Sequence, residues 1–169
     1  MIQVQIEKAV AEYIARSYVM DGVASGDVQE RASLLEWSAP YAGQPALCIR
    51  AGEIMDEATL PAIQVVAQGG EEDEIGNQTF DVEVSLMWPA YGDGITADQL
   101  ARIDTEGERV KSYLFDDAIG ELMQATNVLN TAASVIGVPS RSSRREFVEN
   151  VAVQTFTLNL YACDLAGIY

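Results

Sequence analysis

Four consecutive acids near the middle of the chain have the clearest capacity for chemistry: Glu71, Glu72, Asp73 and Glu74. Carboxylate oxygens are the ligands that Mg²⁺ and Ca²⁺ prefer, so this acidic segment could bind a divalent cation. Asp81 and Glu83, which follow it closely, could form a general acid/base pair. Oxygen-ligand sites normally space their ligands rather than place them side by side, however, and acids flanked by glycines are usually just solvated. We therefore expect no metal site and no cofactor.

Other catalytic chemistry lacks its usual residues. The chain contains no histidine, which removes the commonest general base and the commonest zinc ligand. Its two cysteines, Cys48 and Cys163, lack CxxC spacing and fall in apolar stretches, where a reduced thiol packs as a small hydrophobe. Neither a GxxxxGK[ST] phosphate-binding motif nor a GxGxxG motif after a strand occurs. The sequence thus predicts that the protein is not an enzyme and has no catalytic or cofactor-binding residues.

Charge is the strongest compositional feature. The 26 acids outnumber the 10 bases, and the formal net charge is −16. Such a surface repels nucleic acid and anionic membranes and favours solubility. Three of the bases form a local exception: Arg141, Arg144 and Arg145. This basic segment is either a solvated loop or an ion-pairing contact with an acidic surface of a partner or neighbouring subunit, because complementary charge steers docking.

The acidic segment is predicted to lie at the tip of a long β-hairpin that spans Pro61 to Pro89. The second arm alternates between apolar and polar positions, the period of two that a half-buried strand requires. Its apolar positions are Phe80, Val82, Val84, Leu86 and Trp88. The first arm alternates more weakly, through Ile63, Val65 and Ala67. Two antiparallel strands joined by a long acidic loop account for both arms.

Helices are expected before and after this hairpin. Apolar spacings of three and four predict an amphipathic helix over residues 2–18, and residues 27–37 are predicted to form a short second helical piece. Thr96 and Gln99 fit a capping box at the start of a later helix. The apolar stripe of that helix consists of Leu100, Ile103, Val110 and Leu114. A further helical stretch is expected from Asp116 to about Val128.

Two further strands complete the predicted sheet. Residues 45–53 (PALCIRAGE) form a short apolar run bounded by turn residues, which predicts a strand that ends at Gly52. A closing strand is expected from Val151 onward, with a bulge between Val153 and Phe156 because the apolar positions change parity there. The basic segment precedes this strand within GVPSRSSRRE, which the sequence predicts to be a loop.

These elements predict a single α+β domain over residues 1–169, with a mostly antiparallel sheet of about four strands, a long β-hairpin and helices flanking one face. The length and a hydrophobic content of 49% suit one sizeable core. No apolar run approaches the roughly 18 to 20 residues of a membrane-spanning helix, and the N-terminus lacks the apolar block of a signal peptide. We therefore expect a soluble, cytoplasmic protein.

A known family shares this order of elements. The shared elements are the start IEKAVAEYIARSY, the strands PAIQVVAQ and QTFDVEVSLMW, the helix DQLARIDTEGERVKSYLF, and the late arginine-containing turn before FVENVAVQTFTLNLYA. With these elements, which cover most of its length, the chain resembles the tail terminator or tail-completion proteins of tailed bacteriophages and prophages. The likeness is one of element order rather than of invariant residues.

The resemblance implies a structural virion protein at the head–tail junction, or neck, that is assembled in the host cytoplasm without any membrane. Copies would form a ring, commonly a hexamer, that caps the tail tube protein and joins it to a head-side connector or adaptor protein. DNA would pass through the ring without specific binding, because an acidic lumen repels phosphates. The acidic segment would then face the lumen or an adjoining ring, and the basic segment would contact a neighbouring subunit or a partner.

Two alternatives stay open at this point. The first keeps the structural class and makes the chain a tail-tube or head-completion adaptor protein. The second is a small carboxylate-based, divalent-metal-dependent enzyme or binding domain. The chain departs from the family pattern in its unusually acidic hairpin loop and in its long segment over residues 20–45, so the position within the neck is also open.

Overall fold

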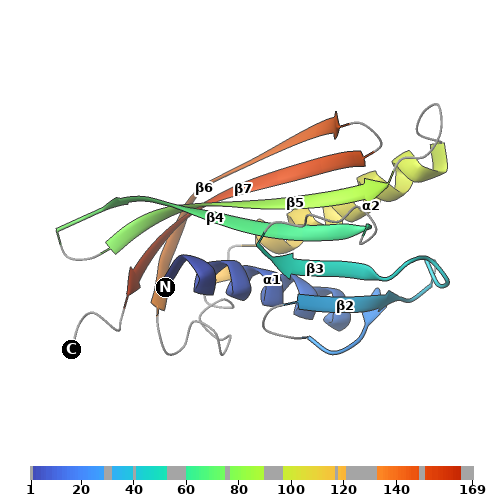
Figure 1. The fold of residues 1–169 in the computed structure, drawn as a ribbon, viewed down its shortest axis with the longest axis horizontal. Helices are drawn as coiled ribbons and strands as arrows, with labels where there is room; N and C mark the ends of the chain where they lie inside the picture. Colours follow the sequence, from blue (N-terminus) through green and yellow to red (C-terminus); the bar gives the residue numbers. More distant parts are fainter. Residues whose placement is uncertain are drawn as a thin grey trace.

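The computed structural model describes residues 2–28, 32–39, 41–52, 60–74, 77–89, 97–116, 118–120, 133–148 and 151–164. These residues have an α+β fold in which two long helices cover a sheet of seven strands, the first of only two residues (Figure 1). The elements in chain order are α1 (Ile2–Met20), β1 (Ala24–Ser25), β2 (Ala32–Trp37), β3 (Leu47–Ala51), β4 (Ala62–Glu72), β5 (Asn77–Pro89), α2 (Ala97–Leu114), β6 (Ala133–Val148) and β7 (Val151–Asp164). The strand order across the sheet is β1-β2-β3-β4-β5-β7-β6.

The prediction of about four, mostly antiparallel strands was wrong. The sheet is mixed, because β3 and β4 run parallel, with Cys48 opposite Ala62 and Ala51 opposite Val65. A parallel pair needs a connection that carries the chain back to the starting end of the sheet. No local sequence pattern marks such a return. The other neighbouring strands pair antiparallel.

The segment 27–37, predicted to be helical, contains strand β2 instead. Leu35 and Trp37 are buried, whereas Leu34 and Glu36 are exposed, which is the alternation of a strand. Leu34 is 66% exposed. An apolar residue therefore occupies a solvent-facing position and hides the period of two in the sequence.

The two strands of the predicted central hairpin are confirmed as β4 and β5, but the predicted long acidic loop between them is wrong, because β4 continues through Glu72. Antiparallel pairing runs from Ala62 opposite Met87 to Gly69 opposite Phe80. The five apolar residues of the second arm and the three of the first are all buried. The strand predicted to end at Gly52 is also present as β3, and Gly52 follows it with a φ of 90°, a conformation that favours glycine.

Strand β7, the predicted closing strand, pairs along the other side of β5. The register is unbroken over Asn77–Pro89 of β5 and Val151–Cys163 of β7, so the bulge predicted between Val153 and Phe156 is wrong. Ala152 faces the core there and is fully buried. Because alanine adds little to an apolar pattern, the sequence suggested a change of parity where the strand is regular. The register shifts occur in the neighbouring strand β6 instead.

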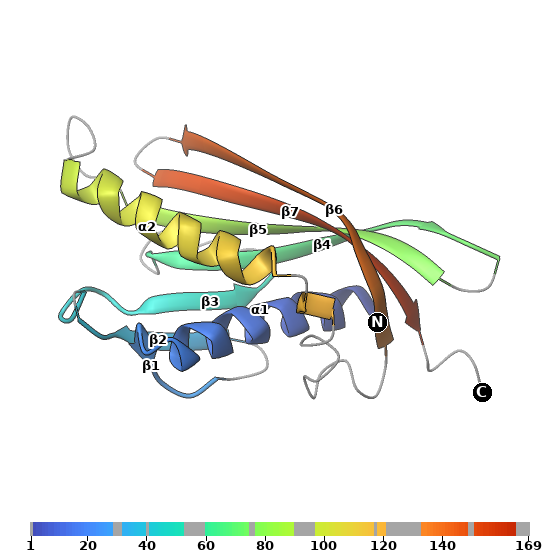
Figure 2. The same ribbon diagram turned by 180° about the vertical axis from the view of Figure 1, so that it is seen from behind.

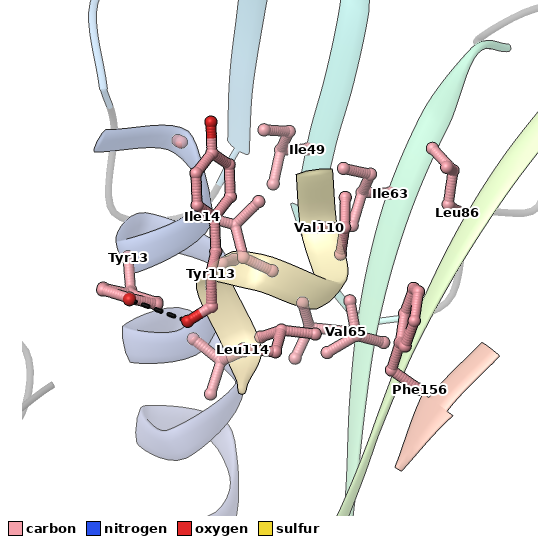
Figure 3. Packing of buried hydrophobic residues seen from close by; sticks show 14 of the residues in the cluster. Tyr13, Ile14, Ile49, Ile63, Val65, Leu86, Val110, Tyr113, Leu114 and Phe156 are labelled. Carbon is pink, nitrogen blue, oxygen red and sulfur yellow. Dashed lines mark hydrogen bonds between the residues drawn. The ribbon is translucent and has the colours of Figure 1, made fainter. Parts of the chain in front are cut away.

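Both described helices lie on the same face of the sheet, as Figure 2 shows from behind, and the face on which no described helix lies is called the open face. Helix α1 packs against β3 and β4, and α2 contacts β7. The core between helices and sheet is drawn in Figure 3, where Ile14 of α1 and Val110 of α2 lie near Ile63 and Val65 of β4. The sheet thus has a buried face and an open face.

The apolar stripe of α2 is partly as predicted. Ile103, Val110 and Leu114 are buried, but Leu100 is exposed. Buried positions of the helix are occupied instead by Glu106 and Gly107, which a search for apolar residues passes over. Thr96 of the capping box and residues 121–132, where the further helical stretch is expected to continue, lie outside the described residues.

Replacing Gly107 with alanine should stabilise the protein by about 0.5–1 kcal/mol, because glycine inside a helix is less favourable than alanine by that amount. A Cβ at this position would lie 3.7 Å from Cγ of Gln154, an ordinary van der Waals contact. Urea unfolding would measure the change. The matched control is Gly26→Ala: Gly26 has a φ of 147° and its Cβ would lie 3.2 Å from the Leu34 carbonyl oxygen, so this variant should lose stability. A destabilised Gly107→Ala protein would contradict the prediction.

Candidate functional site

The acidic segment lies at the tip of the β4–β5 hairpin. Glu71 and Glu72 are the last residues of β4, and Asp73 and Glu74 enter the turn. All four side chains are exposed. In Figures 1 and 2 this end of the hairpin extends past the ends of α1 and β3. The segment is therefore a projection from the body of the protein.

Hydrogen bonds within the hairpin hold this tip in a defined shape. The backbone N–H of Asp73 donates to the Asn77 carbonyl oxygen at 2.8 Å, and the N–H of Asn77 donates to Oδ1 of Asp73 at 2.8 Å. Nε2 of Gln78 donates to the Gly70 carbonyl oxygen at 3.0 Å. The projection therefore has cross-links between its two arms close to the exposed carboxylates.

The basic segment lies in strand β6, and its prediction as a loop was wrong. Arg141 is opposite Leu158 of β7, Arg144 opposite Thr155, and Arg145 opposite Gln154. Serine and arginine dominate this stretch and carry no apolar alternation, so the sequence favours a loop. Pairing with β7 nevertheless supplies the backbone hydrogen bonds of a strand.

Strand β6 is also an edge strand. It ends the strand order of the sheet, so one of its two hydrogen-bonding edges faces no other strand within the described part of the chain. Unpaired N–H and C=O groups along such an edge are a template for another chain. The three arginines belong to this edge strand.

The structure does not bring the acidic and basic segments of one chain together. The pairings place Arg141 and Glu72 four positions apart along the strands and three strand spacings apart across the sheet. At about 3.3 Å per position and about 4.8 Å per spacing, this separation is about 20 Å. The corresponding separation for Arg145 is about 30 Å. Two patches of opposite charge therefore occupy separate places on the same molecule.

The second pair of acids, Asp81 and Glu83, lies exposed on the open face of β5. Nδ2 of Asn159 on β7 donates a hydrogen bond to Oδ1 of Asp81. Among the described residues no three His, Cys, Asp or Glu side chains are grouped as a metal site would require. The expectation that the acidic segment faces a lumen stays a prediction, because a single chain contains no ring axis.

A buried charged pair was not anticipated from the sequence. The side chain of Glu106 on α2 is fully buried, and its Oε1 accepts a hydrogen bond from Nε of Arg109 at 3.1 Å. Burial, followed by the Glu106 carboxylate, raises the pKa of Tyr18 well above its ordinary value and also raises that of Tyr41. The sequence does contain one indication of this burial. Glu106 lies three residues after the apolar Ile103, on the same face of the helix, and therefore points toward the core.

Aromatic rings surround this pair and connect both helices to the sheet. The Tyr18 ring packs edge-on against Tyr113 and Trp37, with centroid distances of 5.5 and 6.0 Å. Oη of Tyr113 donates to Oδ2 of Asp21 at 2.5 Å, and burial together with this carboxylate raises the pKa of Tyr113. The Tyr13 hydroxyl donates to the Tyr113 carbonyl oxygen at 2.8 Å (Figure 3). These contacts join α1 to α2, which makes the cluster a structural element of the helical layer.

The sequence matches no family model and no curated protein. Neither described helix is long and apolar enough to cross a membrane. The arrangement of charged surfaces therefore has to support any proposal about function.

Replacing Arg109 with methionine should cost about 3–5 kcal/mol of stability, because it leaves the Glu106 carboxylate buried without its cation. Urea unfolding would measure the loss. The matched control is Arg16→Met, which removes the partner of Glu12. Arg16 is 53% exposed against 28% for Arg109, and the Glu12 side chain keeps 8% exposure whereas Glu106 has none, so the control should lose less stability. Equal losses of stability in both variants would show that the burial of Glu106 does not increase the contribution of its ion pair.

Raising the pH above 10 should lower the free energy of unfolding, because Tyr18 and Tyr113 keep their protons in the folded protein. The pKa values of Tyr18 and Tyr113 are raised in the folded state, so the unfolded chain, with an ordinary tyrosine pKa of 10.0, releases these protons first. Their contribution is fully present below pH 10 and is lost as the pH rises toward the raised values. Unfolding curves from about pH 9 to about pH 12 should show a smaller slope for Tyr18→Phe and Tyr113→Phe. Tyr161→Phe, at an exposed position of β7, should keep the original slope.

Proposed function

We propose that this chain is a structural, non-enzymatic virion protein at the head–tail junction of a tailed bacteriophage or prophage. In this role it is a tail terminator or tail-completion protein. Its copies form a ring, commonly a hexamer, that caps the tail tube and joins it to the head-side connector. The observation that carries the proposal is the placement of two unlike charged surfaces, a projecting acidic hairpin and a basic edge strand, on separate parts of one chain.

A ring of identical subunits needs such a pair of surfaces. Each copy must present one patch to the copy before it and a different, complementary patch to the copy after it. The separation of about 20–30 Å between the acidic and basic segments prevents a chain from satisfying both patches by itself. Repetition of one contact between successive copies then gives a closed ring when the rotation closes.

The charge of the chain fits a conduit for DNA. A net charge of −16 places like charge opposite the phosphates, so DNA meets repulsion within about one Debye length, 8–10 Å, and does not bind by releasing counterions. Asp81 and Glu83 on the open face of β5 are exposed and supply acids for such a surface. The ring is assembled in the host cytoplasm and resides in the neck of the virion.

Particles made without this protein should carry overlong tail tubes, or heads and tails that are not joined, when imaged by electron microscopy. The purified protein should form rings in solution or at the ends of tail tubes, which mass measurement and imaging would detect. Tubes of normal length beside unjoined heads would favour a head-completion adaptor, and a complete lack of tubes would favour a tube protein. Normal, infectious particles, or a monomer that binds Mg²⁺ or Ca²⁺ tightly, would contradict the proposal.

A further inference from the structure

We infer that, in the ring, the acidic segment of each copy docks on the basic segment of strand β6 of the next copy. The inference rests on the proposed function for the ring itself, and it names the contact that builds it. The ligand of the β6 edge is thus a second copy of this chain. The site is the arginine-bearing half of an edge strand rather than a pocket.

The distribution of charge selects this edge. The basic segment holds three of the 10 bases within five residues, in a chain with 26 acids. Four other described bases are already engaged: Arg16 pairs with Glu12, Arg109 pairs with Glu106, Arg102 lies over the Tyr41 ring and Lys111 over the Phe115 ring. Two copies of so acidic a protein repel each other over most orientations. The electrostatic potential that most favours the acidic segment of another copy is therefore the one at the basic segment of β6.

The shape of the hairpin suits it to insert between subunits. Its four acids are exposed, and cross-strand hydrogen bonds at Asp73 and Gln78 hold the two arms together near the tip. A projection that is ordered before binding loses less conformational entropy on docking than a flexible loop does. The acceptor is also ordered, because β6 is paired along β7 through the whole basic segment.

The partner has to be another molecule. Arg141 and Glu72 of one chain are about 20 Å apart along the sheet, and Arg145 and Glu72 about 30 Å, beyond the reach of two facing side chains. The contact is consequently heterologous and leaves each copy with one unused tip and one unused edge until the ring closes. Because the acidic segment then lies in the contact between copies, the lumen is lined by the exposed acids of the open face.

Charge exchange between two variants tests the contact. Variant A carries Glu71→Lys, Glu72→Lys and Glu74→Lys, and leaves Asp73 in place because its carboxylate accepts the Asn77 N–H. Variant B carries Arg141→Glu, Arg144→Glu and Arg145→Glu. Each variant alone opposes like charges at the contact, whereas a mixture of A and B pairs unlike charges at every contact of an alternating ring. Sedimentation over a concentration series at low salt measures self-association, and circular dichroism verifies folding.

We expect each variant alone to associate at least about tenfold more weakly than the unmodified protein, and the equimolar mixture to recover association within about threefold. A control with Glu36→Lys, Asp98→Lys and Glu108→Lys makes the same change in net charge as variant A at exposed positions elsewhere, and it should not weaken association.

Two outcomes would overturn the inference. Rings of variant A that are as stable as those of the unmodified protein would show that the acidic segment lies away from the contact, for example toward the lumen. Failure of the mixture to recover, with both variants folded, would show that these two segments do not face each other. An unmodified protein that forms no ring in solution or on tube ends would instead refute the proposed function, and the contact with it.

Discussion

The pairing of β5 with β7 is the interaction on which the rest of the structure depends. It joins residues 77–89 to residues 151–163 over an unbroken register. Strand β5 contributes five buried apolar side chains and is paired on both sides, with β4 and with β7. Because β7 occupies the side of β5 away from β4, β6 is displaced to the edge of the sheet. The arginines are therefore at an edge because of where β7 pairs.

The central hairpin was predictable because its information is local. Alternation along β5 specifies a half-buried strand, and glycines and acids mark the turn within the same short stretch. The closing strand was predictable for the same reason, although alanine at position 152 disguised its regularity. The acidic segment lies at the end of the hairpin, as its two flanking arms predict, but Glu71 and Glu72 belong to β4 rather than to a loop.

Features that depend on distant partners were not predictable. Strand β2 looks helical because Leu34 is apolar yet exposed, and only its pairing with β3 defines its two faces. The basic segment lacks any strand pattern, and its conformation comes from β7. The parallel pairing of β3 with β4 depends on the path of the connection between them. Glu106 is tolerated in the core because Arg109, one turn away, supplies the compensating charge.

The helical layer explains how one face of the sheet stays open. Both helices cover the same face, and the aromatic cluster around Tyr18 and Tyr113 ties them to each other. This arrangement concentrates the apolar core on one side of the sheet. The opposite face of β5 carries the exposed acids Asp81 and Glu83, whereas Ser85 of β5 and Thr155 of β7 on the same face are buried.

The irregular half of β6 has a consequence for the solution behaviour of the protein. Its register shifts lie on both sides of Gly137, and Pro139, which has no N–H to donate, lies between Gly137 and the next paired residue, Ser140. Bulges, proline and clustered charge are the devices that protect sheet edges from indiscriminate strand addition and fibril growth. An edge of this kind discourages aggregation of the chains at high concentration.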